Sequence, residues 1–419
     1  MTVTAIARRD AAADSAAGTR WQTTPAVFVL LLAVTSRGVI EVVTGKQVAY
    51  AVQLICALAL VWILHRRGAA LPGGAVRWGG YVALYILVIG GVASAIITLN
   101  TWHLDSLIAP ALYVATFAVL GLMLCWGTHR DRVSDNLRVV TPGASAVVLV
   151  QVAVASGQQY LGWTFAAGSD QASVALQVRP AGLTGSYLHY PLVLSVLAIL
   201  LVGAWMRHRR PVPLVCAGVA VAGVLLSYSR SGMMILALTL VFALLFSRTV
   251  STRLATLLVV GLVVAAVLLF LQGSPVLDRA LSALDLESSG NAGRVAQWAA
   301  GFETWSRSPL LLGSHTGLVT NITRNFGGVS FGVVESSLLQ QLLNLGIVGA
   351  VATYWLLLAV VRAVPTADVW VRAGAAACVA QTVIYQSVEV LPFVTLLAIL
   401  PLTFSARPVV PTHIGQGSG

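Results

Sequence analysis

The sequence predicts an all-α, polytopic integral membrane protein, and three observations support this prediction. Hydrophobic residues make up 58% of the 419 residues and charged residues only 9%, whereas soluble domains are about 25% charged. The mean hydropathy is +0.88. The apolar residues also gather in runs of about 20, the length that crosses a bilayer as a helix. A water-soluble fold could not bury this much apolar surface.

We expect about twelve membrane-spanning helices, separated by short polar connections and one long loop. The expected spans are residues 25–44, 47–64, 78–98, 107–126, 139–156, 187–206, 212–227, 232–247, 253–271, 336–361, 368–386 and 390–405. The chain then divides into a tail (1–24), nine spans (25–271), a large polar loop (272–335), three spans (336–405) and a second tail (406–419). The first tail has no apolar core, so we expect no cleaved signal peptide.

The basic residues predict how the chain is oriented. When the N-terminal tail is placed inside, most of the 25 Lys and Arg residues fall in inside loops, as the positive-inside rule requires. Both termini are then cytoplasmic and the loop 272–335 is extracytoplasmic. The net charge of +11 follows from this topology and gives no support for a nucleic-acid partner.

Motifs for several other functions are absent from the sequence. It contains no GxxxxGK[ST] loop, no HExxH and no metal-spaced histidine cluster, so neither a nucleotide, a metal nor another cofactor is predicted. The four cysteines all lie in apolar runs, and we expect them to be small core residues. The chemical side chains are concentrated on the outer face, chiefly in the loop 272–335.

Arg230 lies in the turn Ser227-Tyr-Ser-Arg-Ser-Gly232, at the outer end of two short predicted helices. An arginine there needs water, a partner or a ligand. It could extend its side chain to lipid phosphates. The serines, Gly232 and the following helix N-terminus favour an anion site instead.

The segment 291–306 of the loop predicts an amphipathic helix on the membrane surface or over the bundle. Arg294 lies near its start and toward the polar side, where a cation opposes the helix dipole. A functional reason for Arg294 is therefore favoured. The apolar residues expected on one face are Val295, Trp298, Ala299, Phe302 and Trp305.

Two loop residues could transfer protons. His315 lies between two glycines in Ser308-Pro-Leu-Leu-Leu-Gly-Ser-His-Thr-Gly317, and its ordinary pKa suits proton transfer near neutral pH. Glu335 stands where the loop re-enters the membrane. It could be a helix-capping carboxylate or, if partly buried, a general base.

Four further charged or titratable positions lie on the expected outer face. Arg179 and His189 flank the segment that leads into the span 187–206 and could face the same cavity, although His189 also suits an interfacial helix end. Arg37 is expected to pair with Glu41, four residues later.

The order of these motifs resembles the O-antigen ligase and Wzy-type polymerase superfamily of bacterial envelope glycosyltransferases. A Ser-x-Ser-Arg-x-Gly turn is followed by Gly-Arg-x3-Trp, by Ser-Pro-Leu-x2-Gly-x-His-x-Gly and by a helix with Leu-Leu-Asn-Leu-Gly346-Ile-Val-Gly349. The likeness is clearest over Arg179–Gly349. It implies a metal-independent, GT-C-like enzyme of the bacterial plasma membrane. Such an enzyme moves a glycan from a polyprenyl-diphosphate carrier to a sugar hydroxyl of a glycan or glycolipid acceptor.

The resemblance also implies roles for single residues. Arg230 and Arg294 match family arginines thought to hold the diphosphate, with Arg179 as a third cation. Ligases of this family carry a histidine as candidate base just before the helix that follows the loop, and this chain has Glu335 there. The departure argues against a lipopolysaccharide ligase and suits a polymerase-like or divergent member. It leaves Glu335 and His315 as alternative bases.

Two other functions remain open at this point. A transporter or flippase for an anionic, lipid-linked substrate could use the same arginines, but the predicted spans hold few central charges to line a path. A non-catalytic partner in envelope assembly would tolerate replacement of the outer arginines.

Overall fold

The computed structural model describes residues 23–67, 75–104, 106–128, 136–166, 179–247, 253, 289–321, 332 and 334–404. Every regular element in these residues is an α-helix. After a helix over Thr23–Thr35 come α2 (Arg37–Thr44), α3 (Lys46–Arg66), α4 (Ala75–Trp102), α5 (Ile108–Gly127), α6 (Asn136–Tyr160), α7 (His189–His208), α8 (Pro211–Leu226), α9 (Arg230–Phe246), α12 (Ser289–Ser306), α13 (Ser337–Ala363), α14 (Val369–Ile384) and α15 (Leu391–Thr403).

Apart from α12, which lies in the predicted loop, these helices fall within a few residues of the predicted spans, and the first span is divided into two helices. Within the described ranges, six helices are long and apolar enough to cross a membrane, or seven if the first bent pair is one span. Four more apolar helices have 10–17 residues. The predicted span 253–271 lies outside the described residues except for Arg253, and so do both tails apart from Thr23 and Thr24. The polytopic all-α class is confirmed, whereas the number twelve stays a prediction.

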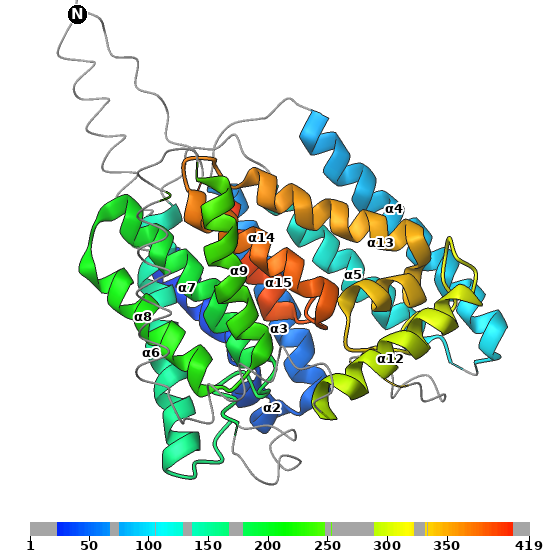
Figure 1. Cartoon of the computed structure of the whole chain (residues 1–419), viewed down its shortest axis with the longest axis horizontal. Coiled ribbons are helices and arrows are strands. Elements are labelled where there is room, and N and C mark those ends of the chain that lie inside the picture. The colour runs from blue at the N-terminus through cyan, green and yellow to red at the C-terminus, as the bar shows by residue number, and fades with distance from the viewer. Residues whose placement is uncertain are drawn as a thin grey trace, which may run out of the picture.

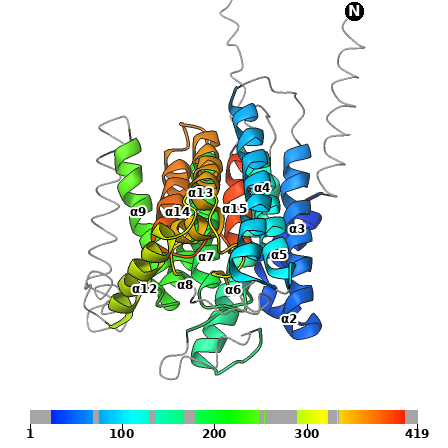
Figure 2. The same ribbon diagram turned by 90° about the vertical axis from the view of Figure 1, so that its right-hand side faces the viewer.

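The long helices stand side by side as one bundle, with α2 and α12 at its lower end in Figure 2. We call this the α12 end. The first residues of α13 meet the last of α14 there, because the Ser337 amide donates to the Tyr385 carbonyl at 3.3 Å. Figure 1 shows α12 alongside α13, on the side away from α6 and α8.

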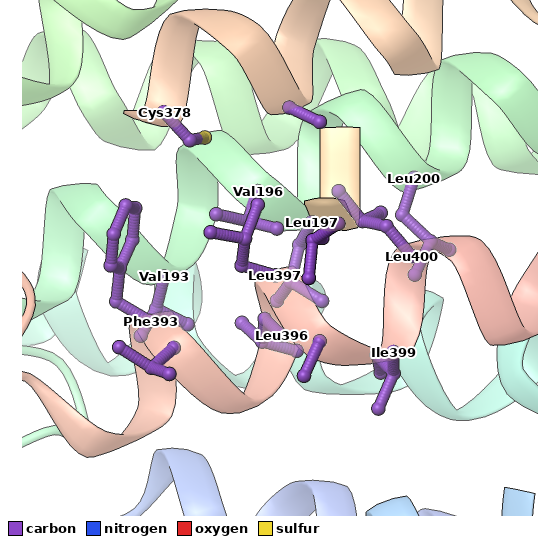
Figure 3. Close-up of a cluster of buried hydrophobic side chains, with 14 of the residues drawn as sticks. Val193, Val196, Leu197, Leu200, Cys378, Phe393, Leu396, Leu397, Ile399 and Leu400 are labelled. Atoms are coloured by element: carbon purple, nitrogen blue, oxygen red, sulfur yellow. The ribbon is translucent and has the colours of Figure 1, made fainter. Parts of the chain in front are cut away.

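The centre of the bundle is formed by α7, α14 and α15. Glycine allows close approach here, since a Cβ at Gly374 of α14 would lie 2.5 Å from Ile199 of α7. Tight packing matters in a membrane, because lipid tails are as apolar as the side chains and van der Waals contact drives association. The fully buried residues that Figure 3 labels at this contact are Val193, Val196, Leu197, Leu200, Cys378, Phe393, Leu396, Leu397 and Leu400.

The first predicted span is broken rather than continuous. The helix Thr23–Thr35 and α2 meet at 73°, and a break inside lipid leaves carbonyl groups that must find donors. The Val34 carbonyl accepts a hydrogen bond from Gln53 Nε2. The Thr35 carbonyl accepts one from Gln151 Nε2 at 2.8 Å. Two buried amide side chains therefore stabilise the bend that turns α2 across the α12 end.

The loop before α7 is folded into the bundle. Residues 181–186 are buried, and glutamines of α6 satisfy their backbone groups. Gln158 Oε1 accepts from the amides of Ala181 and Gly182, both at 2.9 Å. Gln151 Oε1 accepts from the Leu183 amide at 2.8 Å. The loop therefore holds Arg179 and the start of α7 in defined places.

The helix α13 is interrupted at Gly346. This residue has a φ of 66°, in the left-handed region that L side chains rarely adopt. A Cβ there would lie 2.3 Å from the backbone of Leu311. The break therefore requires glycine, and it admits a loop segment into the middle of the helix.

That segment hydrogen-bonds both halves of α13. The Leu310 carbonyl accepts from the Ile347 amide at 2.9 Å, and the Leu343 carbonyl accepts from the amides of Ser314 and His315 at 3.1 Å. The loop thus supplies the partners that the broken helix lacks. The motif that ends at Gly317 and the Asn-Leu-Gly346 motif form one structural unit, in which Thr316 Oγ1 donates to the Asn344 carbonyl across 28 residues of the chain.

Candidate active site

The structure brings Arg294 and Glu335 together. The guanidinium Nε of Arg294 forms an ion pair with a carboxylate oxygen of Glu335, and its Cζ lies 4.9 Å from the ring centroid of Tyr385. These three side chains come from α12, from the residue two before α13, and from the end of α14. A cation, a carboxylate and an aromatic face therefore converge at the α12 end.

The start of α13 fixes the place of Glu335. Ser336 is the N-cap, and its Oγ accepts from the Leu339 amide at 3.3 Å and donates to the Val383 carbonyl at 2.6 Å. Glu335 precedes this cap, so it is not the first-turn capping carboxylate that one interpretation of the sequence allowed. Its carboxylate is left to face Arg294.

Ser337 ties the same point to the end of α14. Its Oγ donates to the Tyr385 carbonyl at 3.0 Å and accepts from the amides of Ser387 and Val388 at 2.8 and 3.0 Å. The backbone that carries Tyr385 is therefore locked to the first turn of α13. Tyr385 and Glu335 keep a fixed relation to each other.

The predicted helix in the loop is present as α12, but its orientation differs from the prediction. Gly301 packs on Leu339, since a Cβ added at Gly301 would lie 2.8 Å from the Leu339 side chain. Trp298 and Trp305 pack against a small buried cluster that includes Leu339 and Leu343 of α13. Arg294 lies on this inward face, about one turn from Trp298 and about three turns from Trp305. The predicted apolar face included Phe302, which is 57% exposed.

The start of α12 also differs from the prediction. The helix begins at Ser289, so Arg294 lies in its second turn rather than its first. The dipole penalty expected for a cation in the first turn is therefore reduced, since the effect fades beyond the terminal turn. The position of Arg294 is explained by its contacts with Glu335 and Tyr385. At the other end of α12, Glu303 and Arg307 form an exposed i,i+4 ion pair.

Arg230 is the first residue of α9 and is only 8% exposed. Its turn is held by serine hydroxyls, since Ser229 Oγ lies 2.9 Å from Ser231 Oγ and the Ser229 amide donates to Ser227 Oγ at 3.2 Å. The N-cap Ser229 makes no side-chain capping bond to the helix. The amide groups of the first turn therefore keep the positive end of the helix dipole.

Arg230 lies close to the start of α7. A Cβ at Gly232 would be 2.8 Å from Cβ of Pro191, so the first turns of α7 and α9 are in contact. His189 is in the same turn of α7, and Arg37 of α2 is its electrostatic neighbour. Arg230 and His189 thus belong to one region of the bundle. Arg37 also makes the predicted ion pair with Glu41, at 3.5 Å.

Arg179 lies beside Tyr187, with its Cζ 5.5 Å from the ring centroid. The buried loop 181–186 places both residues ahead of α7. This is a second arginine held on a tyrosine face, as Arg294 is on Tyr385. Cation–π contacts of this kind orient a guanidinium without neutralising it.

His315 is placed apart from the Arg294–Glu335 pair. It is 2% exposed, and its ring centroid lies 5.2 Å from that of Trp102 of α4. Its backbone amide donates a hydrogen bond to the Leu343 carbonyl. Leu343 is six residues into α13, about 9 Å along the helix from its first residue. Burial lowers the pKa of His315 to about 4.

The sequence interpretation missed Tyr385. It is a single tyrosine at a helix end, and no local pattern marks it.

Glu389, in the same connection between α14 and α15, is 6% exposed, and Gln386 Nε2 donates to its carboxylate. It is an electrostatic neighbour of Tyr50 and Tyr113. Within the described part of the chain, no group of three His, Cys, Asp or Glu residues could hold a metal ion.

The fold and this convergence of charges define an integral membrane protein with a polar site at one end of a helical bundle. Residues 215–354 match the family described as O-antigen ligase. This match confirms the resemblance to the O-antigen ligase and Wzy-type superfamily, and the matched region contains Arg230, Arg294, His315 and Glu335. A search of curated proteins found no match.

Proposed function

We propose that the protein is a membrane glycosyltransferase that transfers or polymerises glycan from a polyprenyl-diphosphate donor onto a sugar hydroxyl, at the outer face of a bacterial plasma membrane. The pairing of Arg294 with Glu335 supports this most. It puts the cation expected to hold a diphosphate beside the carboxylate expected to act as base. A family of glycan-ligating membrane enzymes matches the same region.

The proposed step is a single displacement. The Glu335 carboxylate takes the proton of the acceptor hydroxyl, and that oxygen forms a bond to the anomeric carbon of the donor sugar. The bond from this carbon to the diphosphate oxygen breaks, and its electron pair leaves with the diphosphate. Attack opposite the leaving group inverts the anomeric configuration.

Arg294 and Arg230 would stabilise the charge that develops on the diphosphate, in place of a metal ion. Planar guanidinium groups bind phosphate oxygens in a bidentate manner, and such preorganised donors contribute strongly to transition-state stabilisation. Arg230 is reinforced by the N-terminus of α9. Arg179 would be a third cation, and His189 would line the same region.

The geometry favours Glu335 over His315 as the base. His315 is buried against Trp102, and with a pKa of about 4 it would be a weak proton acceptor near neutral pH. Glu335 is 41% exposed at its side chain, which leaves it accessible to an acceptor. His315 remains the alternative base.

A cell-based glycan assay tests this function. Arg230→Ala, Arg294→Ala and Glu335→Gln are compared with wild type at matched membrane levels. Loss of one such group costs about 100-fold or more in rate, so the glycan product should vanish while the lipid-linked donor accumulates. Arg307→Ala, which removes an exposed cation of the same loop (77% exposed side chain), is the matched control.

Other outcomes would redirect the proposal. Full activity of all three variants would reject the site, and an envelope-assembly role would then fit better. Loss of activity in His315→Ala with full activity in Glu335→Gln would make His315 the base. Donor that stays on the inner face in the arginine variants would indicate a flippase.

A further inference from the structure

We propose that Arg294 exchanges its partner during the reaction: the donor diphosphate displaces Glu335 from Arg294, while Tyr385 holds the guanidinium in place. This inference rests on the proposed function and adds a positioning residue, Tyr385, and an order of events. Donor binding would release the carboxylate that then accepts the acceptor's proton.

The ion pair between Arg294 and Glu335 is accessible to a competing ligand. The side chains of Arg294 and Glu335 are 24% and 41% exposed, so solvent and a ligand can reach both. Ion pairs that water can reach contribute little to stability, because solvent screens them. A diphosphate carries more charge than one carboxylate and accepts bidentate hydrogen bonds from a guanidinium. It would therefore compete well for Arg294.

Tyr385 differs from Glu335 because it is uncharged and does not compete with a diphosphate. Its ring centroid lies 4.9 Å from Arg294 Cζ, and contact with the face of a ring leaves the N–H groups at the edge of the guanidinium available to other acceptors. The backbone of Tyr385 is held by Ser337. Arg294 can thus lose Glu335 without losing its position.

The exchange has a chemical consequence. While Arg294 holds Glu335, a carboxylate oxygen of Glu335 is engaged in the ion pair. Once the diphosphate takes Arg294, that oxygen can turn to the acceptor hydroxyl. The acceptor would then be deprotonated only when a donor is bound.

Binding of farnesyl diphosphate, a short prenyl diphosphate without a sugar, tests the exchange on the full chain in detergent. Glu335→Gln removes the competing charge, so this variant should bind about two- to five-fold more tightly than wild type. Glu335→Ala is a second variant with the same expectation. Glu303→Gln removes an exposed carboxylate of α12 and should leave the affinity unchanged.

Tyr385→Leu tests the positioning role. Loss of the ring should weaken binding of farnesyl diphosphate about two- to five-fold, and Tyr385→Phe should restore it relative to Tyr385→Leu. If Glu335→Gln and Glu335→Ala bind equally well or more weakly than wild type, the exchange is wrong. If Tyr385→Leu binds like wild type, Tyr385 does not position Arg294.

These results can be told apart from failure of the proposed function. That failure would appear as a wild-type chain that binds no farnesyl diphosphate and an Arg294→Ala variant that still makes glycan. The exchange alone fails when wild type binds the ligand and makes glycan but removal of the Glu335 charge does not tighten binding.

Discussion

Arg294 and Arg230 carry the same charge in different surroundings. Arg230 is 8% exposed and belongs to a serine-braced turn between two packed helices. Arg294 is more exposed and is held by one ion pair and one ring. Arg230 is therefore part of the folded frame, whereas Arg294 can change partners. Substitution of Arg230 should also affect folding, so its activity must be compared at equal amounts of folded protein.

At the same scale, buried His315 makes stability depend on pH. Its pKa is about 4 in the folded chain and about 6.5 in the unfolded chain. Between these values the unfolded chain binds the extra proton, so stability is full above pH 6.5 and falls as the pH drops toward 4. The loss is at most about 3 kcal/mol.

Thermal unfolding in detergent at pH 7 and pH 5 measures this effect. His315→Gln should show a smaller difference between the two melting temperatures than wild type, because the neutral amide cannot be protonated. An equal difference in both proteins would show that His315 does not contribute. The exposed His103, replaced by Gln, is the control.

Gly346 is a second residue with a strict requirement. Gly346→Ala would place a Cβ 2.3 Å from the Leu311 backbone at a φ of 66°, which should destabilise the fold by about 3 kcal/mol. The melting temperature and the yield of monodisperse protein measure this. Gly218→Ala in α8, where a Cβ meets nothing within 4 Å, should keep or slightly raise the stability. Equal behaviour of the two variants would contradict the role of the break in α13.

At the scale of elements, one arginine joins three helices at the end opposite α12. Arg207 of α7 donates through Nε to Asp368 Oδ1 at 2.9 Å and through Nη2 to the Phe404 carbonyl at 3.1 Å. Asp368 is the N-cap of α14, and Phe404 ends α15. Because both side chains are largely buried, the pair acts in a low-dielectric setting where a lone charge is costly.

Asp368→Asn should therefore lower stability by about 2 kcal/mol while the activity per folded molecule stays near wild type, since the site lies at the other end. Melting temperature and glycan output, each normalised to folded protein, test this. A large loss of specific activity with normal stability would show that the two ends are coupled. Asp368→Asn with Arg207→Gln should recover part of the stability, because neither charge is then left alone.

At the scale of the whole molecule, the candidate site and the Arg207–Asp368 pair lie at opposite ends of the bundle. If the α12 end is extracytoplasmic, a membrane-impermeant maleimide should label Glu303→Cys in intact cells and should label Arg210→Cys only after lysis. Both residues are exposed. Three native cysteines are buried and Cys56 is partly so, and a variant without all four provides the background. The reverse labelling pattern would overturn the predicted orientation.

The amino-acid sequence alone was enough to predict the class of the protein and most of its helices. Apolar runs of about 20 residues can be stable only as helices in lipid, so the spans and their approximate ends follow from composition and length. Helical periodicity also predicted α12, and the motif order predicted the superfamily that residues 215–354 match. These features depend on local chemistry, which the sequence contains directly.

Which chemical groups meet became clear only from the three-dimensional structure. Arg294 and Glu335 are 41 residues apart, and Tyr385 lies a further 50 residues along the chain, at the end of α14. Periodicity indicates which side of a helix is apolar but not which neighbour it faces, so α12 is rotated from its predicted face and places Arg294 inward. Likewise, the sequence placed His315 in a loop between two glycines. In the structure this loop segment enters the break of α13 at Gly346, and His315 is buried. Such contacts depend on packing between distant segments, which no local pattern encodes.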